Sequence, residues 1–192
     1  GSDTRRYGIA LEQRFNPNVF SGIELTWRDL EAVGIGTGNL GRFTLLDDRK
    51  EQFHRAYVYW TPTRRLAFST EYFYEEEEGE LLAPFKLVTQ QAPIGLSYFW
   101  PAGFFIDGKA TYVNQEFTGL DGTADDQFLI ADLAIGYRLP RRRGILQLVV
   151  KNMLDEQFNF FDPAFRTLAR EPRGPIFAPE TQVLAQFNLS FR

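Results

Sequence analysis

The chain has 192 residues, a formal net charge of −4 and no cysteine. The length is sufficient for one domain with a substantial core. The absence of thiols excludes a disulfide framework and a thiolate metal site, and the negative charge argues against a general nucleic-acid binder. No run of about 18 apolar residues occurs, so we expect no transmembrane helix. We also expect no signal peptide within these residues. Gly1 and Ser2 look like a cloning remnant, in which case the natural chain begins further upstream.

Apolar and polar residues alternate in nine segments, and this period of two predicts β-strands. The segments lie near 5–15, 22–28, 52–60, 66–74, 94–100, 104–115, 129–139, 146–151 and 182–192. The last of them shows the pattern most clearly. One of its faces carries Val183, Ala185, Phe187, Leu189 and Phe191, whereas the other is mostly Gln, Asn and Ser.

The connections between these segments alternate between short and long. Short turns are expected near 16–18, 61–64, 101–103 and 140–144, and long loops near 33–50, 75–90, 119–126 and 155–180. This asymmetry is typical of bacterial outer-membrane barrels, which have short periplasmic turns and long outer loops. Many of the strands are also expected to reach 10 residues, the length that a tilted membrane strand needs.

Full charges occupy the polar side of the predicted strands. Charges cannot face lipid without a large free-energy cost, so we expect them to line a hydrated lumen. The expected lumen-lining residues are Glu12, Arg14, Glu24, Arg28, Arg55, Glu71, Asp107, Lys109, Asp132, Arg138 and Lys151. The competing interpretation is a soluble barrel or sandwich whose charged face meets water.

Aromatic residues favour the membrane interpretation, because they are expected at both ends of the apolar face of the predicted strands. Phe15, Trp60, Trp100 and Phe104 adjoin short turns, whereas Tyr72, Tyr74 and Tyr112 lie toward the long loops. Two aromatic girdles at opposite strand ends are typical of a membrane interface.

The segment Val150-Lys151-Asn152-Met153-Leu154-Asp155-Glu156-Gln157-Phe158 resembles the Val-x-Asn-Leu-Phe-Asp-x-x-Tyr pattern of TonB-dependent outer-membrane receptors. In that family the pattern lies on the penultimate barrel strand. Residues 134–144 look like the preceding strand and its periplasmic turn. The whole chain also resembles C-terminal barrel regions of receptor-like proteins with upstream tetratricopeptide repeats. The resemblance implies a barrel, but no segment resembles a plug domain, and the chain ends Phe191-Arg192 rather than on the aromatic residue.

Candidate sites outside the strands are few. The single histidine, His54, is expected at the rim of the oily face without a catalytic role, so we expect no enzyme. Asp121, Asp125 and Asp126 could bind Ca²⁺ but more simply form a solvated loop, so no metal or cofactor is expected. The acidic run 75–80 is expected to be a mobile loop that could attract cations. Loop 155–180 could constrict the lumen, contact lipopolysaccharide or be disordered, and its contact candidates are Phe160, Phe161, Arg166, Arg170 and Arg173.

An odd strand number is awkward, because bacterial single-chain barrels have even numbers. Loop 155–180 could supply a tenth strand, one strand could be wrongly assigned, or the chain could be part of a larger barrel. The orientation of the strands favours the last of these.

The sequence thus predicts an all-β antiparallel transmembrane barrel of about 8–10 strands in the bacterial outer membrane. Its expected partners are membrane lipid, lipopolysaccharide and an upstream domain or further strands, but no nucleic acid. The predicted function is a pore, or the translocation part of a receptor-like transporter for small solutes or a secreted partner. The alternatives are a non-conducting anchor whose outer loops bind a partner, and a soluble ligand-binding barrel.

Overall fold

The computed structural model describes residues 3–38, 41–79, 85–120, 122–158 and 180–189, and only the backbone of 32–47. These residues form one antiparallel sheet of nine strands in chain order. The strands are β1 (Asp3–Asn16), β2 (Val19–Gly38), β3 (Gly41–Thr63), β4 (Leu66–Gly79), β5 (Phe85–Phe99), β6 (Phe104–Gly119), β7 (Gly122–Arg138), β8 (Gly144–Lys151) and β9 (Gln182–Leu189). The prediction of nine antiparallel strands is therefore confirmed. No helix in the described part of the chain is long and apolar enough to cross a membrane.

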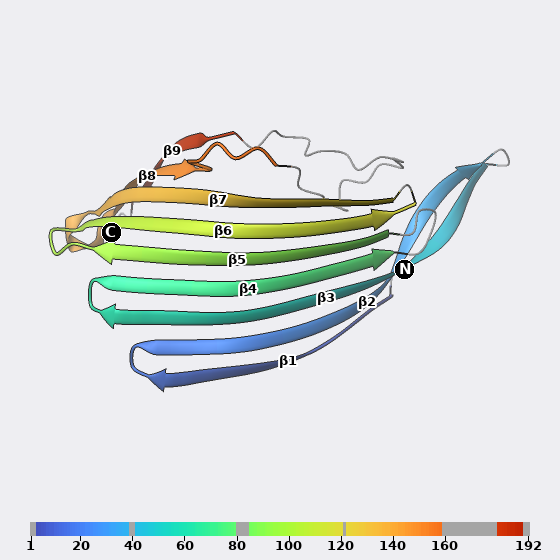
Figure 1. Ribbon diagram of the computed structural model, residues 1–192, viewed down its shortest axis with the longest axis horizontal. Coiled ribbons are helices and arrows are strands. Elements are labelled where there is room, and N and C mark those ends of the chain that lie inside the picture. Colours follow the sequence, from blue (N-terminus) through green and yellow to red (C-terminus); the bar gives the residue numbers. More distant parts are fainter. Residues whose placement is uncertain (1–2, 39–40, 80–84, 121, 159–179, 190–192) are drawn as a thin grey trace.

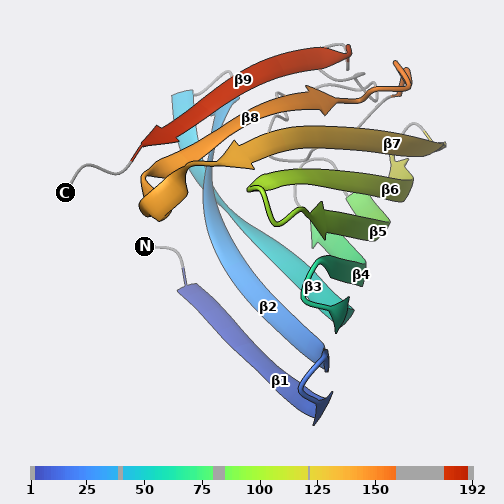
Figure 2. The same ribbon diagram turned by 90° about the vertical axis from the view of Figure 1, so that its left-hand side faces the viewer.

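The sheet is curved and open (Figures 1 and 2). Each strand pairs with its neighbours in sequence, and β1 and β9 lie at the two ends of the arc, each with a single partner strand among the described residues. The nine described strands therefore form an open sheet and do not close into the barrel that the sequence predicted.

Three of the regions expected as long loops are mostly strand, so those expectations are wrong. β2 and β3 cover nearly all of 33–50 and pair from Ala32 with Asp47 to Gly38 with Gly41. This hairpin projects beyond β4, whose last partner on β3 is Arg49 (Figure 1). The acidic residues 75–79 belong to β4, and β6 and β7 reduce the loop at 119–126 to a tight turn. Interstrand hydrogen bonding overrides the loop-like local composition in all three regions.

The short turns lie close to their predicted positions. The turn expected at 61–64 falls instead at Arg64 and Arg65, because β3 continues to Thr63 with a register irregularity after Trp60. The Thr63 hydroxyl accepts hydrogen bonds from the amides of Arg65 and Leu66, at 3.2 and 3.1 Å, and so closes the turn. The turn at 140–144 contains Arg141 at φ 58° and Gly144 at φ 152°.

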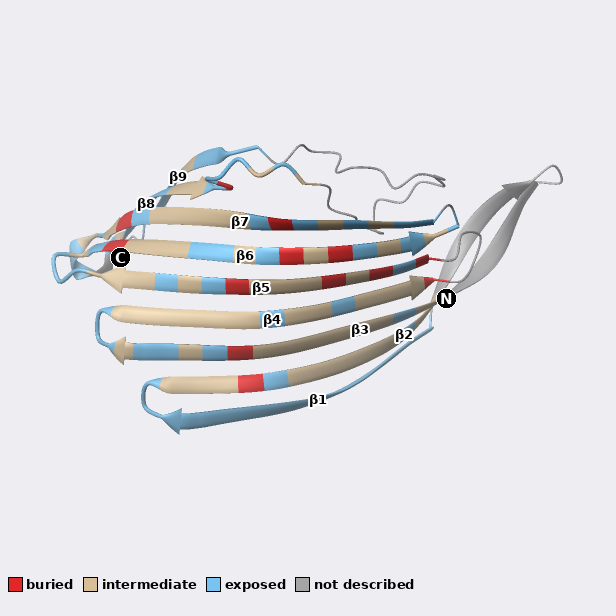
Figure 3. Cartoon of the chain, viewed as in Figure 1, coloured by how far each residue is buried: buried red, intermediate tan, exposed pale blue. Residues whose placement is uncertain are grey.

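Within the described strands, the buried side chains belong to one face of the curved sheet, and Figure 3 shows where buried residues fall along the chain. Asn152, which follows β8, is buried as well. The core residues are Tyr57, Phe85, Leu87, Phe105, Val113 and Phe128, together with Thr89 and Gln115. Strand pairing places these residues on one face. Side chains converge on the inside of a curved sheet, so we name this the concave face and its opposite the convex face.

Candidate functional site

All eleven charged residues predicted to share a side do lie on the concave face. The pairing connects them across the strands, for example Glu24 opposite Arg55 and Lys109 opposite Asp132. Because side chains alternate with period two, a slip of one residue in any strand would have moved its charges to the other face.

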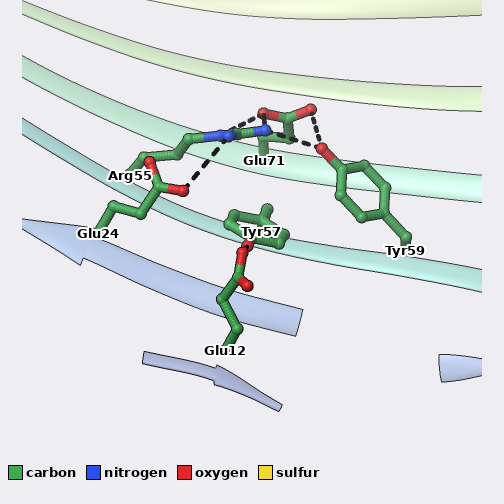
Figure 4. A network of polar contacts seen from close by, with 6 residues as sticks. All are labelled: Glu12, Glu24, Arg55, Tyr57, Tyr59 and Glu71. Carbon is green, nitrogen blue, oxygen red and sulfur yellow. Dashed lines mark hydrogen bonds and ion pairs between the residues drawn. The ribbon is translucent and has the colours of Figure 1, made fainter. Parts of the chain in front are cut away.

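Four of the eleven residues meet in one polar network on β1–β4 (Figure 4). The Arg55 Nε atom donates to a Glu71 Oε2 atom at 2.8 Å, and one guanidinium nitrogen lies 3.8 Å from Glu24. Glu12 accepts a hydrogen bond of 2.5 Å from the Tyr57 hydroxyl, over whose ring the Arg55 guanidinium lies at 4.5 Å. The network thus connects four strands through alternating charge.

Tyr57 and Tyr59 complete this network, and neither was predicted from the sequence as a site residue. The Tyr59 hydroxyl accepts from Arg55 and donates to Glu71, both at 2.8 Å. A possible signal was their spacing: Arg55, Tyr57 and Tyr59 alternate on the charged side of one strand. Aromatic rings with a polar end can satisfy charged neighbours while remaining buried.

The other concave charges are held separately. Arg28 forms an ion pair with Glu51, and the Arg138 guanidinium lies 4.4 Å from the centroid of the Phe99 ring. Asp132 accepts a hydrogen bond of 2.9 Å from the backbone N–H of Asn152. Among the described residues, the Arg14 side chain bonds to two carbonyls of its own turn. Asp107, Lys109 and Lys151 form no ion pair within the described residues. An open hollow of 380 Å³ lies beside Asp107, Lys109, Asp132 and Glu71, where Ser69 and Ser97 supply hydroxyls.

Three buried aromatic rings on the concave face lie over the glycine directly opposite on the neighbouring strand. The pairs are Tyr57 with Gly22, Phe85 with Gly79, and Phe105 with Gly136. A Cβ atom on Gly136 would lie 2.2 Å from the Phe105 ring and 2.9 Å from the Leu146 carbonyl oxygen. Each glycine therefore provides the space in which a ring becomes buried.

We expect Gly136→Val to lower the free energy of unfolding by about 1–3 kcal/mol, because it overpacks the site of Phe105. Gly108→Val is the matched control, since a Cβ atom there meets nothing within 4 Å. Urea unfolding of both variants measures the difference. Equal stability of the two variants would show that the ring does not depend on its glycine.

The convex face carries an apolar band that crosses all nine strands. On β6 the band runs from Phe104 to Tyr112, and on β7 from Leu129 to Tyr137, nine residues in each case. Many of its side chains are exposed, including Leu96 at 52% and Phe187 at 72%. Large exposed apolar surfaces mark interaction or membrane sites, and about 9–11 residues suit a tilted membrane strand.

Aromatic residues border this band at both ends. At the short-turn end, Tyr98 contacts Trp100 and Phe104 contacts Tyr137, with ring centroids 4.6 and 4.8 Å apart. At the other end a row of rings crosses β1–β4, namely Tyr7, Trp27, His54 and Tyr74. His54 thus lies among aromatic rings at the rim of the convex face.

Three tyrosines at the long-loop end of the band direct their hydroxyls toward polar neighbours. Tyr74 donates to Glu76 at 2.5 Å, and Tyr72 and Tyr112 donate to Gln90 and Gln127, each at 3.2 Å. Rings that pack on an apolar surface while their hydroxyls bond outside it suit a boundary between oil and water.

Charges resume on the convex face just beyond this row and alternate in sign across five strands. The register places Arg5 opposite Asp29, Asp29 opposite Lys50, Lys50 opposite Glu78, and Glu78 opposite Lys86. Lys86 contacts Glu78 at 2.8 Å and Glu76 at 3.0 Å. We call this row the rim ladder. It explains how the acidic residues 75–78, which were expected in a mobile loop, form a regular strand.

The rim ladder predicts a pH dependence with a defined sign. Bonds to Glu78 and Glu76 raise the pKa of Lys86. Burial opposes ionisation of Glu76, but Tyr74 and Lys86 outweigh it and lower the pKa of that carboxyl below its usual 4.5. Its stabilising contribution is therefore lost as the pH falls through the lowered pKa, whereas that of Lys86 is lost only in strong base.

We therefore expect Lys86→Gln to reduce stability slightly and equally from about pH 5 to pH 10, with the deficit vanishing in acid. Urea midpoints of the two proteins across this range measure it. A deficit that grows as the pH falls would contradict the pairing with Glu76.

Of the remaining sequence-predicted candidates, only two lie in the part of the chain that the structure describes. Asp125 and Asp126 lie in β7, and no group of three or more metal-ligating side chains occurs among the residues that the structure describes. Asp121 and the loop candidates Phe160, Phe161, Arg166, Arg170 and Arg173 fall outside the described residues.

Comparison with known proteins returns no relative. No family model, no curated protein and no solved structure matches the chain. The resemblance to TonB-dependent receptors remains a prediction from the sequence.

Proposed function

We propose that this chain forms part of the wall of a bacterial outer-membrane β-barrel. The barrel acts as a pore, or as the translocation part of a receptor-like transporter for small solutes or a secreted partner. The observation that carries the proposal is the division of the sheet into two faces. The convex face has an exposed apolar band with aromatic borders, and the concave face holds all eleven predicted charged residues. Lipid outside and water inside is the environment that suits this division.

The three tryptophans provide a direct test. Trp27 and Trp60 lie on the convex face. Trp100 follows β5, contacts the convex ring of Tyr98 and donates its backbone N–H to the Phe104 carbonyl. We expect brominated lipids to quench each of them in single-tryptophan variants folded into vesicles. Bromine near the headgroups should quench most strongly, since all three tryptophans border the band.

The matched control places a tryptophan on the concave face, in the variant Phe73→Trp with Trp27, Trp60 and Trp100 replaced by phenylalanine. Phe73 lies opposite Arg55, inside the polar network. We expect this tryptophan to escape bromine but to respond to aqueous iodide. Strong bromine quenching at residue 73, or none at the native tryptophans, would overturn the proposal. A chain that folds and remains monomeric without detergent would favour the soluble barrel.

A non-conducting anchor is the second candidate, and the filled concave face favours it. Tyr57, Phe105 and Phe128 are 4–5% exposed there, and the network reaches across four strands. Planar-bilayer recordings of the vesicle-folded protein separate the two functions. Steady ion current supports the pore, whereas its absence in protein that passes the quenching test supports the anchor.

A further inference from the structure

Among the described residues β1 and β9 each have one open edge, and these two strands run in the same direction. β1 runs from Asp3 to the short turn after Asn16, and β9 runs from Gln182 toward the same end, antiparallel to β8. In a sheet whose strands alternate in direction, the first and ninth strands must be parallel. Direct pairing of β9 with β1 would therefore be parallel, unlike all eight existing pairs.

Both edges carry the two-faced pattern to their last strand. Ile9 and Leu11 of β1 are 66% and 71% exposed on the convex face, and Val183 and Phe187 of β9 are 63% and 72% exposed there. The concave positions of both edges are mostly polar, with Gly8, Ala10 and Leu184 as the exceptions. Each edge therefore offers backbone groups to a neighbour that would continue both faces. Unpaired backbone groups in lipid cost several kcal/mol each, so in a membrane these edges require occupants.

We infer that the sheet is completed by an odd number of further strands, inserted between β9 and β1 and supplied by polypeptide outside these nine strands. The inference rests on the proposed function for its premise that the sheet closes in a membrane. If the inserted strands pair antiparallel with both β9 and β1, the first and the last of them both run opposite to β1 and β9. Because neighbouring inserted strands alternate in direction, their number must be odd. The total is then even, as in bacterial single-chain barrels. The inserted strands carry apolar residues on the convex side and polar residues on the concave side.

A strand-extension series tests the parity. Copies of Gly144–Lys151 and Gln182–Leu189 are appended alternately after Arg192 through two-residue turns, giving extensions of zero, one, two and three strands. The length of each connecting segment is chosen so that the apolar side of every added strand lies on the convex face. We expect slow amide hydrogen exchange in β1 and heat-modifiable gel migration for one and three added strands, but not for zero or two. Closure with zero or two added strands would overturn the inference.

Disulfide trapping in the unextended chain tests the main competitor, a parallel seam within one chain or between two copies arranged about a common axis. Ile9→Cys is combined with Val183→Cys or Phe187→Cys, and the control pair is Ile9→Cys with Leu25→Cys, which lie directly opposite each other. We expect rapid disulfide formation only in the control. Efficient trapping between β1 and β9 would overturn the inference. Bromine quenching of the same samples distinguishes this failure from failure of the membrane proposal, because it reports lipid contact whether or not the sheet closes.

Discussion

Leu96→Arg is expected to lower the free energy of unfolding in lipid vesicles by about 2–4 kcal/mol, the cost of a cationic side chain at the middle of a lipid-facing strand. Leu96 lies at the centre of the apolar band on β5, opposite Phe68 and Gly108, and is 52% exposed. If water covered this face, the same change would alter stability by no more than about 0.5 kcal/mol. Urea unfolding in vesicles measures the difference.

Thr123→Arg is the matched control, because Thr123 lies on the same face in the row that contains Lys86. Beyond the aromatic border the cost should fall to about 0–1 kcal/mol. Equal losses of unfolding free energy at positions 96 and 123 would show that arginine disturbs the sheet itself. No loss at position 96 would show that lipid does not cover the convex face.

The faces of this sheet could be predicted from the sequence because a strand has only two sides. The alternation of Val183, Ala185 and Phe187 with glutamines determines which residues share a side, whatever the strand's neighbours are. Antiparallel neighbours joined by short turns then transmit that assignment across the sheet. For this reason residues as distant as Glu12 and Lys151 could be placed on one face before the fold was known.

The ends of the strands could not be predicted, because they depend on partners rather than on local composition. The glycines at 34, 36 and 38 and the glutamates at 75–78 are typical of loops. In the structure the glycines pair with β3 and the glutamates meet cations on adjacent strands, including Arg49 and Lys86. Such a pairing depends on the partner strand, and the composition of one segment alone does not reveal it.

The polar network was predicted only in part for the same reason. Alternation placed Glu12, Glu24, Arg55 and Glu71 on one side, but the register decides which of them meet. Arg55 lies directly opposite Glu24 but reaches Glu71 diagonally, since its direct partner on β4 is Phe73. The tyrosines were missed because the sequence suggested aromatic residues for the lipid border rather than for the inside.

Arg55→Gln should lower the free energy of unfolding by about 2–3 kcal/mol through loss of charge-assisted hydrogen bonds. The guanidinium bonds to Glu71 and Tyr59 at 2.8 Å and lies 3.8 Å from Glu24. Without it the two carboxylates remain half-buried and lack their shared cation. Arg55→Lys should recover little, because an ammonium group cannot bond to both partners with the geometry of a guanidinium.

A double-mutant cycle with Glu71→Gln separates the pair from general disturbance. We expect the double variant to be clearly more stable than the sum of the two single losses implies, because removing both partners leaves no uncompensated charge between them. Arg14→Gln is the control on the same face, since Arg14 is exposed and its side chain bonds to carbonyls of its own turn. Strict additivity in the cycle, or an equal loss for Arg14→Gln, would mean that Arg55 acts by covering the Tyr57 ring rather than by joining the strands through charge.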